Sequence, residues 1–168
     1  MHDVDGCIAC DLSWGRRPCP GGLIHRTDHW LVEHCIGPLG LGTLVVKPER
    51  HVVHVADLDE AEAAELGPLV RHATGVVSRL CDAEQVYVCL WSHGPAHIHF
   101  VIQPVDGALM DRLGAHGPKL QVAMLESEPT PNEAAVEAFA AAARREFGTP
   151  QLPIGVPRSE GTRGSLGE

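Results

Sequence analysis

Two parts of the chain carry residues whose types and spacing are suited to chemistry. Near the start, Cys7 and Cys10 form a C-x-x-C pair, a spacing used for metal binding or for thiol redox chemistry. Farther along, residues 97–103 read His-Ile-His-Phe-Val-Ile-Gln, and a strand with this sequence places His97 and His99 on one face. The opposite face is apolar and is expected to pack on helices. Two imidazoles on one strand face therefore indicate a reactive centre.

A zinc site is one use of the cysteine pair. Zinc takes four nitrogen or sulfur donors in a tetrahedron, so two thiolates need two further ligands that the fold brings close. We choose His51, which follows residues 47–50 at the end of a predicted strand, and His97, which opens the histidine-rich strand. The expected ligands are thus Cys7, Cys10, His51 and His97. On spacing alone, spare thiols beside a surface histidine are an equal alternative, and a thiol redox pair is a third.

The strands that position these residues follow from short apolar runs bounded by glycine and proline. We expect strands at residues 23–26, 30–32, 43–46, 85–91 and 97–103. The turn at residues 92–95, of sequence Ser-His-Gly-Pro, joins the last two strands into an antiparallel hairpin.

Two helices are predicted from apolar residues that recur at helical spacing. Asp57 and Glu60 have the spacing of a capping box, and the apolar stripe that follows predicts a helix over residues 58–81. Gly67 and Pro68 are expected to kink this helix or to tighten its first turns rather than end it, because the stripe stays in phase beyond Pro68. A second stripe predicts a helix over residues 133–147.

These elements predict one α+β domain over residues 1–148, with an antiparallel sheet and helices packed on one face. Residues 104–131 are expected to be irregular, with room for one short helix. Residues 149–168 are rich in glycine, proline, serine and arginine and are expected to be disordered.

Composition limits the partners and the compartment. With 13 Lys and Arg against 22 Asp and Glu, the formal charge is −9, which disfavours polymeric nucleic acid as a partner. The first residues lack the pattern of a signal peptide, and no run approaches the roughly 18 apolar residues of a membrane span. We expect a cytoplasmic protein that binds no membrane, and the excess of arginine over lysine is typical of a bacterium with a GC-rich genome.

The order of these motifs resembles the histidine triad (HIT) superfamily over roughly residues 5–105. The C-x-x-C pair is followed by Gly-Thr-Leu-Val-Val-Lys-Pro-Glu-Arg-His-Val at 42–52, by an acidic-capped helix, and by His-Ile-His-Phe-Val-Ile-Gln-Pro at 97–104. The similarity is to the zinc-containing branch, which includes diadenosine polyphosphate hydrolases and galactose-1-phosphate uridylyltransferase-like proteins.

The resemblance implies a metal site and a catalytic residue. It implies a structural zinc held by Cys7, Cys10, His51 and His97; His54 in place of His51 matches the pattern less well. It also implies that His99 is the nucleophile in nucleotidyl transfer, acting on a small nucleotide substrate in a homodimer. A neutral imidazole that attacks an α-phosphate forms a nucleotidyl-histidine, which water or another acceptor then resolves.

Further residues near His99 are candidates to bind the phosphate. Ser92 in the turn and Gln103 on the strand are suitable donors, although each is equally compatible with an ordinary structural role. The third histidine of the triad is replaced by Val101. His93, in the same turn as Ser92, is a candidate to replace the missing third histidine, although an exposed loop histidine is the favoured interpretation. The function expected is therefore a nucleotide hydrolase or nucleotidyltransferase, and the alternative is a zinc-stapled nucleotide-binding module that has lost its activity.

Overall fold

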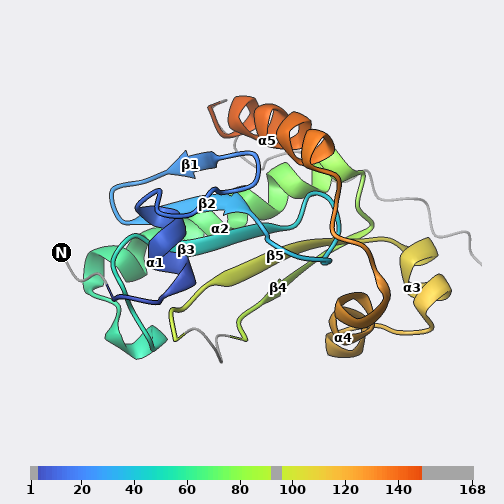
Figure 1. Cartoon of the computed structure of the whole chain (residues 1–168), viewed down its shortest axis with the longest axis horizontal. Coiled ribbons are helices and arrows are strands. Elements are labelled where there is room, and N and C mark those ends of the chain that lie inside the picture. Colours follow the sequence, from blue (N-terminus) through green and yellow to red (C-terminus); the bar gives the residue numbers. More distant parts are fainter. Residues whose placement is uncertain (1–3, 92–95, 149–168) are drawn as a thin grey trace, which may run out of the picture.

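The computed structural model describes residues 4–91 and 96–148 of the chain. Five strands form one antiparallel sheet in the order β1-β2-β3-β5-β4 (Figure 1). They are β1 (Leu23–Arg26), β2 (Trp30–His34), β3 (Leu44–Pro48), β4 (Gln85–Cys89) and β5 (Phe100–Val105). The α-helices in the described residues are α1 (Ile8–Ser13), α2 (Glu60–Cys81), α3 (Gly107–Leu113), α4 (Pro118–Ser127) and α5 (Glu133–Gly148). This architecture confirms the predicted α+β fold.

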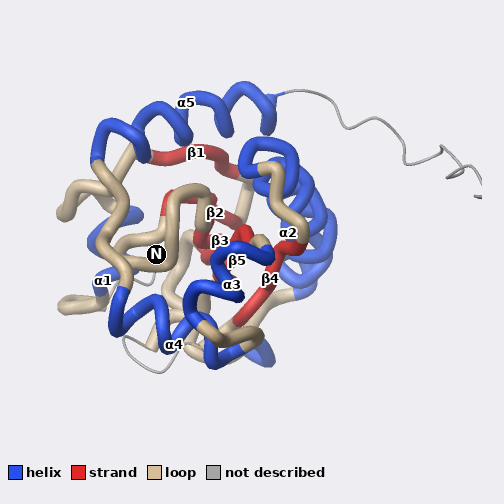
Figure 2. The backbone as a smooth tube through the Cα atoms, turned by 90° about the vertical axis from the view of Figure 1, so that its right-hand side faces the viewer, coloured by secondary structure: helices blue, strands red, loops and turns tan. Residues whose placement is uncertain are grey.

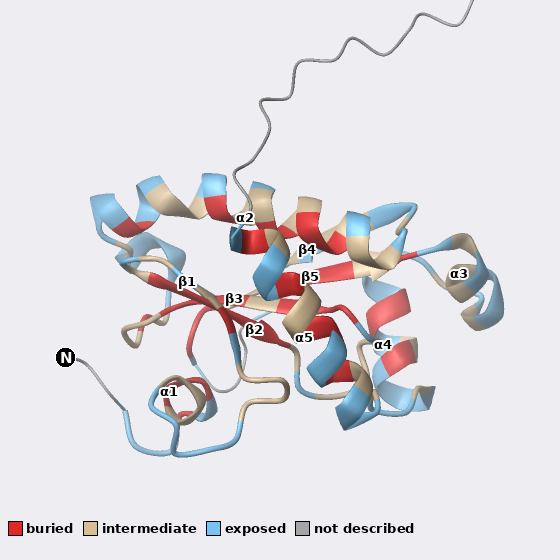
Figure 3. Ribbon diagram, turned by 90° about the horizontal axis from the view of Figure 1, so that it is seen from above, coloured by how far each residue is buried: buried red, intermediate tan, exposed pale blue. Residues whose placement is uncertain are grey.

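Helices α2 and α5 cover one face of the sheet and enclose the main apolar core (Figure 2). From the sheet, Trp30, Val46 and Ile102 are fully buried, and they pack with Val76 of α2 and Phe139 of α5. Figure 3 shows the strands largely buried, with α2 on one side of the sheet and α1 on the other. Helix α2 does not end at Pro68, in agreement with the prediction, and its buried residues Leu69, Ala73, Val76 and Val77 follow this proline.

The opposite face of the sheet, which was predicted to carry no helices, is covered by α1 near β3 and by α4 near β5. The ammonium of Lys47 in β3 donates to the carbonyl of Ala9 in α1, over 2.9 Å. The amide of Gln103 in β5 lies 2.9 Å from the sulfur of Met124 in α4. Because neighbouring residues in a strand point to opposite faces, these contacts place α1 and α4 across the sheet from α2.

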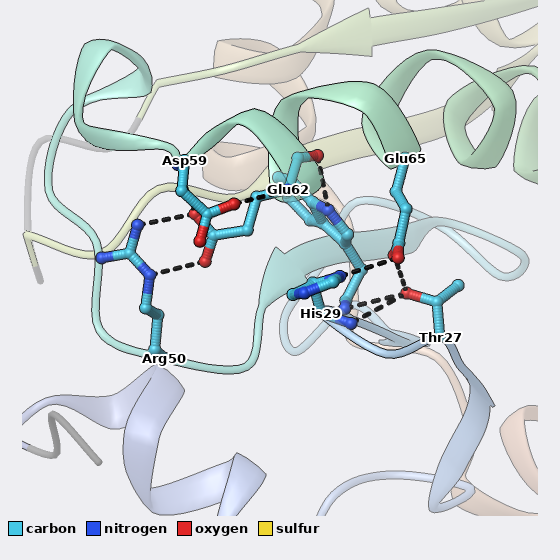
Figure 4. A network of polar contacts seen from close by, with 7 residues as sticks. Thr27, His29, Arg50, Asp59, Glu62 and Glu65 are labelled. Carbon is cyan, nitrogen blue, oxygen red and sulfur yellow. Dashed lines mark hydrogen bonds and ion pairs between the residues drawn. The ribbon is translucent and has the colours of Figure 1, made fainter.

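The first turn of α2 carries a capping box, two residues later than predicted. The Asp59 side chain accepts from the backbone N–H of Glu62, and the Glu62 carboxylate accepts from the backbone N–H of Asp59, both over 2.8 Å (Figure 4). The prediction of Asp57 and Glu60 in these roles was wrong, because Val55–Asp57 forms a short 3-10 helix before α2 begins. The shift keeps the chemistry of the motif and moves only its register.

The hairpin of β4 and β5 is shorter than predicted, and the segment after it is more regular. Strand β4 ends at Cys89 and β5 begins at Phe100, inside the predicted limits of 85–91 and 97–103. Residues 104–131 contain two helices, α3 and α4, where one short helix was expected. No helix in the described residues is both long enough and apolar enough to cross a membrane.

Candidate functional site

The ligand atoms of Cys7, Cys10, His51 and His97 all lie within 4.8 Å of one another. The Cys10 sulfur is 3.4 Å from Nδ1 of His51 and 3.6 Å from Nδ1 of His97, and the Cys7 sulfur is 3.6 Å from the same His97 atom. In a tetrahedral zinc site, bonds of about 2.3 Å to sulfur and about 2.0 Å to nitrogen separate these atoms by about 3.5 Å. The donors are therefore spaced as zinc requires.

The two cysteines reach the site from the first turn of α1. Cys7 is the N-cap residue of this helix, Cys10 lies within its first turn, and both are buried. The backbone N–H of Asp11 donates to the Cys7 carbonyl over 2.9 Å, which closes the first turn. Residues three apart in a helical turn share a side, so both sulfurs point toward the sheet.

The two histidines lie just outside the ends of two adjacent antiparallel strands, His51 after β3 and His97 before β5. His51 follows the end of β3, and its neighbour Arg50 makes two bonds to the Glu62 carboxylate, of 2.5 and 2.6 Å (Figure 4). A backbone hydrogen bond joins the residues that directly follow the two histidines, because the N–H of Ile98 donates to the carbonyl of Val52 over 2.8 Å. The start of α2 and the segment before β5 thus fix both ligand-bearing loops.

His97 is held in the form that binds a metal. Its ring is fully buried, and its Nε2 lies 3.2 Å from the carbonyl oxygen of Pro48. A proton on Nε2 donated to that carbonyl leaves the Nδ1 lone pair directed at the two sulfurs. Burial lowers the pKa of His97 to about 4, so the ring is neutral at neutral pH. The four residues fit a structural zinc with all four positions filled by protein, which leaves no open position for substrate.

His99 presents a ring with a defined tautomer. Its Nδ1 lies 2.9 Å from the backbone carbonyl oxygen of His97, so Nδ1 carries the proton and donates it. The Nε2 atom is then the unprotonated nitrogen with a lone pair. The ring is half-buried, in contrast to the fully buried zinc ligand two residues earlier. This arrangement provides a nucleophilic or basic nitrogen beside the metal centre.

Gln103 lies on the same face as His99 but is engaged in the interior. Its side chain is fully buried, and its amide N–H group donates to the carbonyl of Leu39 over 3.3 Å. Its carbonyl accepts from the Gln121 amide of α4 over 2.8 Å. These bonds occupy the amide that was predicted to contact phosphate, and that role stays a prediction.

The remaining predicted positions divide between described and undescribed parts of the chain. Val101 is buried opposite Val45 of β3 and Cys89 of β4, so this part of the face is apolar. Ser92 and His93, the other predicted phosphate-binding residues, lie outside the described residues, as does the predicted tail at 149–168.

Two polar features of this face were not found by the sequence analysis. Lys47 and Glu33 form a buried ion pair, with Nζ 2.7 Å from Oε1. Gln121 links Gln103 to the indole N–H of Trp91, which lies 2.6 Å from its Oε1. A charged residue within the apolar run of β3 was the available signal for the first feature. The second needed knowledge of where α4 packs.

Searches found no family model and no curated protein that matches the chain. Among solved structures, a Zn-bound histidine triad family protein from Mycobacterium smegmatis is similar, with 17% identity, a TM-score of 0.62, and coverage of 85% of this chain and 94% of that one. A Hit-like protein involved in cell-cycle regulation, from Bartonella henselae, has 18% identity and a TM-score of 0.65, with coverage of 87% of this chain and 99% of that one. A protein named as a hypothetical histidine triad nucleotide-binding protein, from Sulfolobus tokodaii, has 17% identity and a TM-score of 0.64, with coverage of 84% of this chain and 92% of that one.

The chain has the histidine triad fold. The HIT fold here spans nearly the full length of these solved chains, so the similarity covers more than the motif region at 5–105. One of the similar structures was determined with zinc bound, in agreement with the cluster of two cysteines and two histidines. Within the HIT fold of this chain, His97 of the metal cluster and His99 lie two residues apart in the segment directly before β5.

Proposed function

We propose that this chain is a nucleotide-processing enzyme that cleaves a nucleoside phosphate, of the dinucleoside polyphosphate class, through a covalent nucleotidyl-histidine on His99. The observation that carries the proposal is the 2.9 Å contact between Nδ1 of His99 and the His97 carbonyl oxygen, because it leaves Nε2 as the free nucleophile. The HIT fold supports a nucleotide as the substrate, since a similar solved structure is named a nucleotide-binding protein.

In the first step the Nε2 lone pair of His99 attacks the α-phosphorus. A bond forms between nitrogen and phosphorus while the bond from phosphorus to the bridging oxygen breaks, and the leaving phosphate departs with that electron pair. The ring becomes positively charged, and the carbonyl of His97 stabilises this charge by accepting the Nδ1 proton in a hydrogen bond. His97 supports the step through its backbone while its ring is held in the metal cluster.

In the second step an acceptor attacks the same phosphorus. When the acceptor is water, a phosphorus–oxygen bond forms, the phosphorus–nitrogen bond breaks, and the electron pair returns to Nε2. The water proton leaves to solvent or to the released nucleotide, and the starting tautomer of His99 is restored. The zinc ion has a structural role in this scheme, because it holds α1 and the segment before β5 together.

Val101 narrows the class of leaving group. The valine side chain has no proton to give, so this position cannot protonate a departing oxygen. A phosphate or polyphosphate leaves as a stable anion and needs little protonation, whereas an alkoxide or an amine needs a full proton. The apolar surroundings of Val101 therefore favour phosphoanhydride substrates.

A nucleotide-binding module without turnover is the second candidate. The same valine favours it, as does the Gln103 amide, whose hydrogen bonds to Leu39 and Gln121 engage it in the interior. Both candidates share the zinc cluster and the fold, so only chemistry at His99 separates them.

The experiment is to incubate the zinc-loaded chain with a panel of mononucleotides, dinucleoside polyphosphates and nucleotide sugars and to measure product formation. The His99→Ala variant is compared with His54→Ala, a matched change at an exposed histidine outside the metal cluster. Turnover of a phosphoanhydride by the unmodified chain and by His54→Ala, with its loss in His99→Ala, is the expected result. Nucleotide binding without turnover of any member of the panel establishes the binding module instead.

A further inference from the structure

The ion pair of Lys47 and Glu33 connects the sheet to the helix that carries the cysteines. Lys47 is 1% exposed and Glu33 is 5% exposed, so both charged groups are almost completely removed from water. They lie on neighbouring strands, where Lys47 faces Leu31 and Glu33 faces Val45, so they form a diagonal pair on one face. A buried pair of this kind is costly to form and contributes little stability by itself.

The second partner of Lys47 gives this pair a local role. The ammonium also donates to the carbonyl oxygen of Ala9, over 2.9 Å. Ala9 lies between the cysteines of the C-x-x-C pair and directly precedes Cys10. The Lys47 side chain therefore binds the backbone of helix α1 between the two cysteines.

Helix α1 has little else in its own structure to fix its position. It is only 6 residues long, and a helix of this length is not stable alone in water. Its buried residues Cys7, Ala9 and Cys10 form a small apolar cluster of their own, apart from the main core between the sheet and α2. The geometry of the sulfurs thus depends on anchors that reach α1 from the sheet.

The same part of β3 also orients the imidazole ligands. The carbonyl of Pro48, the residue after Lys47, accepts from the His97 ring, and His51 follows three residues later. Strand β3 accordingly contacts helix α1 through the side chain of Lys47 and the His97 ring through the backbone of Pro48.

We propose that Lys47, held by its ion pair with Glu33, is a positioning residue for the zinc centre. Its bond to Ala9 keeps the two sulfurs at tetrahedral spacing from the histidine nitrogens before the metal arrives. This role concerns metal affinity and does not depend on the proposed catalytic function.

The test measures zinc affinity by competition with a chromophoric chelator. Lys47→Met removes the ammonium but leaves Glu33 buried without its charge partner, which can prevent folding. The double variant Glu33→Leu/Lys47→Met removes both charges and keeps apolar volume, so it is the main test. Ser13→Ala is the matched control, because the Ser13 hydroxyl donates to the same Ala9 carbonyl over 2.8 Å from within the helix and makes no link to the sheet.

We expect the double variant to bind zinc roughly 10- to 100-fold more weakly, the range for losing a residue that orients metal ligands. Ser13→Ala should bind zinc as the unmodified chain does. The melting temperature is measured with zinc and with chelator, and the increase due to zinc should shrink in the double variant. Unchanged affinity and an unchanged zinc-dependent increase in that variant would overturn the proposal, and an equal loss in Ser13→Ala would show that any contact at Ala9 suffices.

Discussion

The backbone carbonyl of His97 accepts a hydrogen bond from Nδ1 of His99 over 2.9 Å, while the ring of His97 points its own Nδ1 at the sulfurs of Cys7 and Cys10. The side chain of His97 thus belongs to the metal cluster, and its backbone orients the ring of His99. Because of this link, the position of the His99 ring depends on the integrity of the zinc cluster.

Loss of a zinc ligand should destabilise the whole fold. Cys10→Ser is expected to lower zinc content to near zero and to reduce the melting temperature by roughly 10 °C, since zinc binding is coupled to folding and about 3 kcal/mol shifts a domain of this size by that order. Metal analysis and thermal unfolding measure both effects. Cys35→Ser is the control, because the Cys35 thiol lies outside the cluster and contacts the Ile36 carbonyl. Full zinc content in Cys10→Ser would contradict the ligand assignment.

His99 and His97 should separate chemistry from metal binding. We expect His99→Ala to keep one zinc per chain and to lose at least about 10³-fold in turnover, because only the nucleophile is removed. His97→Ala should lose both zinc and turnover. Metal analysis beside steady-state kinetics distinguishes the two variants, and loss of zinc in His99→Ala would mean that the two functions are not divided as described.

The contact between His29 and Glu65 should give a pH-dependent contribution to stability. Its hydrogen bond to Glu65 raises the pKa of His29 above 6.5, and bonds from Thr27 and His29 lower the pKa of Glu65 below 4.5 (Figure 4). Because the pKa of His29 is raised on folding, its contribution to stability is fully present below pH 6.5 and is lost as the pH rises through the pKa of the folded state. Because the pKa of Glu65 is lowered on folding, its contribution to stability is present above pH 4.5 and is lost as the pH falls through the pKa of the folded state.

The contact between His29 and Glu65 therefore stabilises the fold most between pH 4.5 and pH 6.5. His29→Gln should lower the melting temperature most between pH 4.5 and 6.5, and the deficit should shrink as the pH rises above 6.5 through the raised pKa of His29. His54→Gln, at an exposed histidine, should show no such trend. A deficit in His29→Gln that is constant with pH would exclude the charged form of this contact.

The amide chain between β5 and α4 should contribute to folding. Gln121 is buried and bonds to both Gln103 and the Trp91 indole, so Gln121→Ala leaves two polar groups without this partner. The expected cost is about 2 kcal/mol, or a melting temperature lower by roughly 4–8 °C. Gln85→Ala, at an exposed position in β4, should change the melting temperature little.

Among the strands in the described residues, β4 forms an edge of the sheet, and this edge leads us to expect a homodimer. Strand β1 at one edge is covered by α5, whose Arg144 donates to the Leu23 carbonyl over 2.9 Å. Strand β4 forms the other edge, and its Val88 is 44% exposed. Since open edges favour strand pairing, we expect light scattering to give twice the chain mass of 18.0 kDa, and Val88→Lys to give a monomer. A monomeric unmodified chain would refute this prediction.

The ligand set was predictable from the sequence because each member has a local mark. The C-x-x-C spacing, the histidine after the Pro-x-Arg step of β3 and the His-x-His strand are all visible in the linear chain. Their convergence depends on the pairing of β3 with β5, which the apolar runs do not specify and which only the structure shows.

The interior role of Gln103 could not be predicted, because it depends on a distant helix. Residues 104–131, where α4 forms, were expected to be irregular with room for one short helix, and strand alternation alone cannot tell a face open to substrate from a face covered by a helix. The contact of Lys47 with helix α1 could not be predicted for the same reason. Ala9 lies 38 positions from Lys47, and only the folded chain brings them together.

The most direct test of the central claim is to trap the reaction on His99. The zinc-loaded chain is mixed with a phosphoanhydride substrate labelled on its α-phosphate, quenched rapidly in base, and digested for peptide mapping. The account predicts an acid-labile label, about one per chain at most, on the peptide that contains His99, and none in His99→Ala. Turnover of the same substrate with no label on His99, or with the label on another residue, would contradict it.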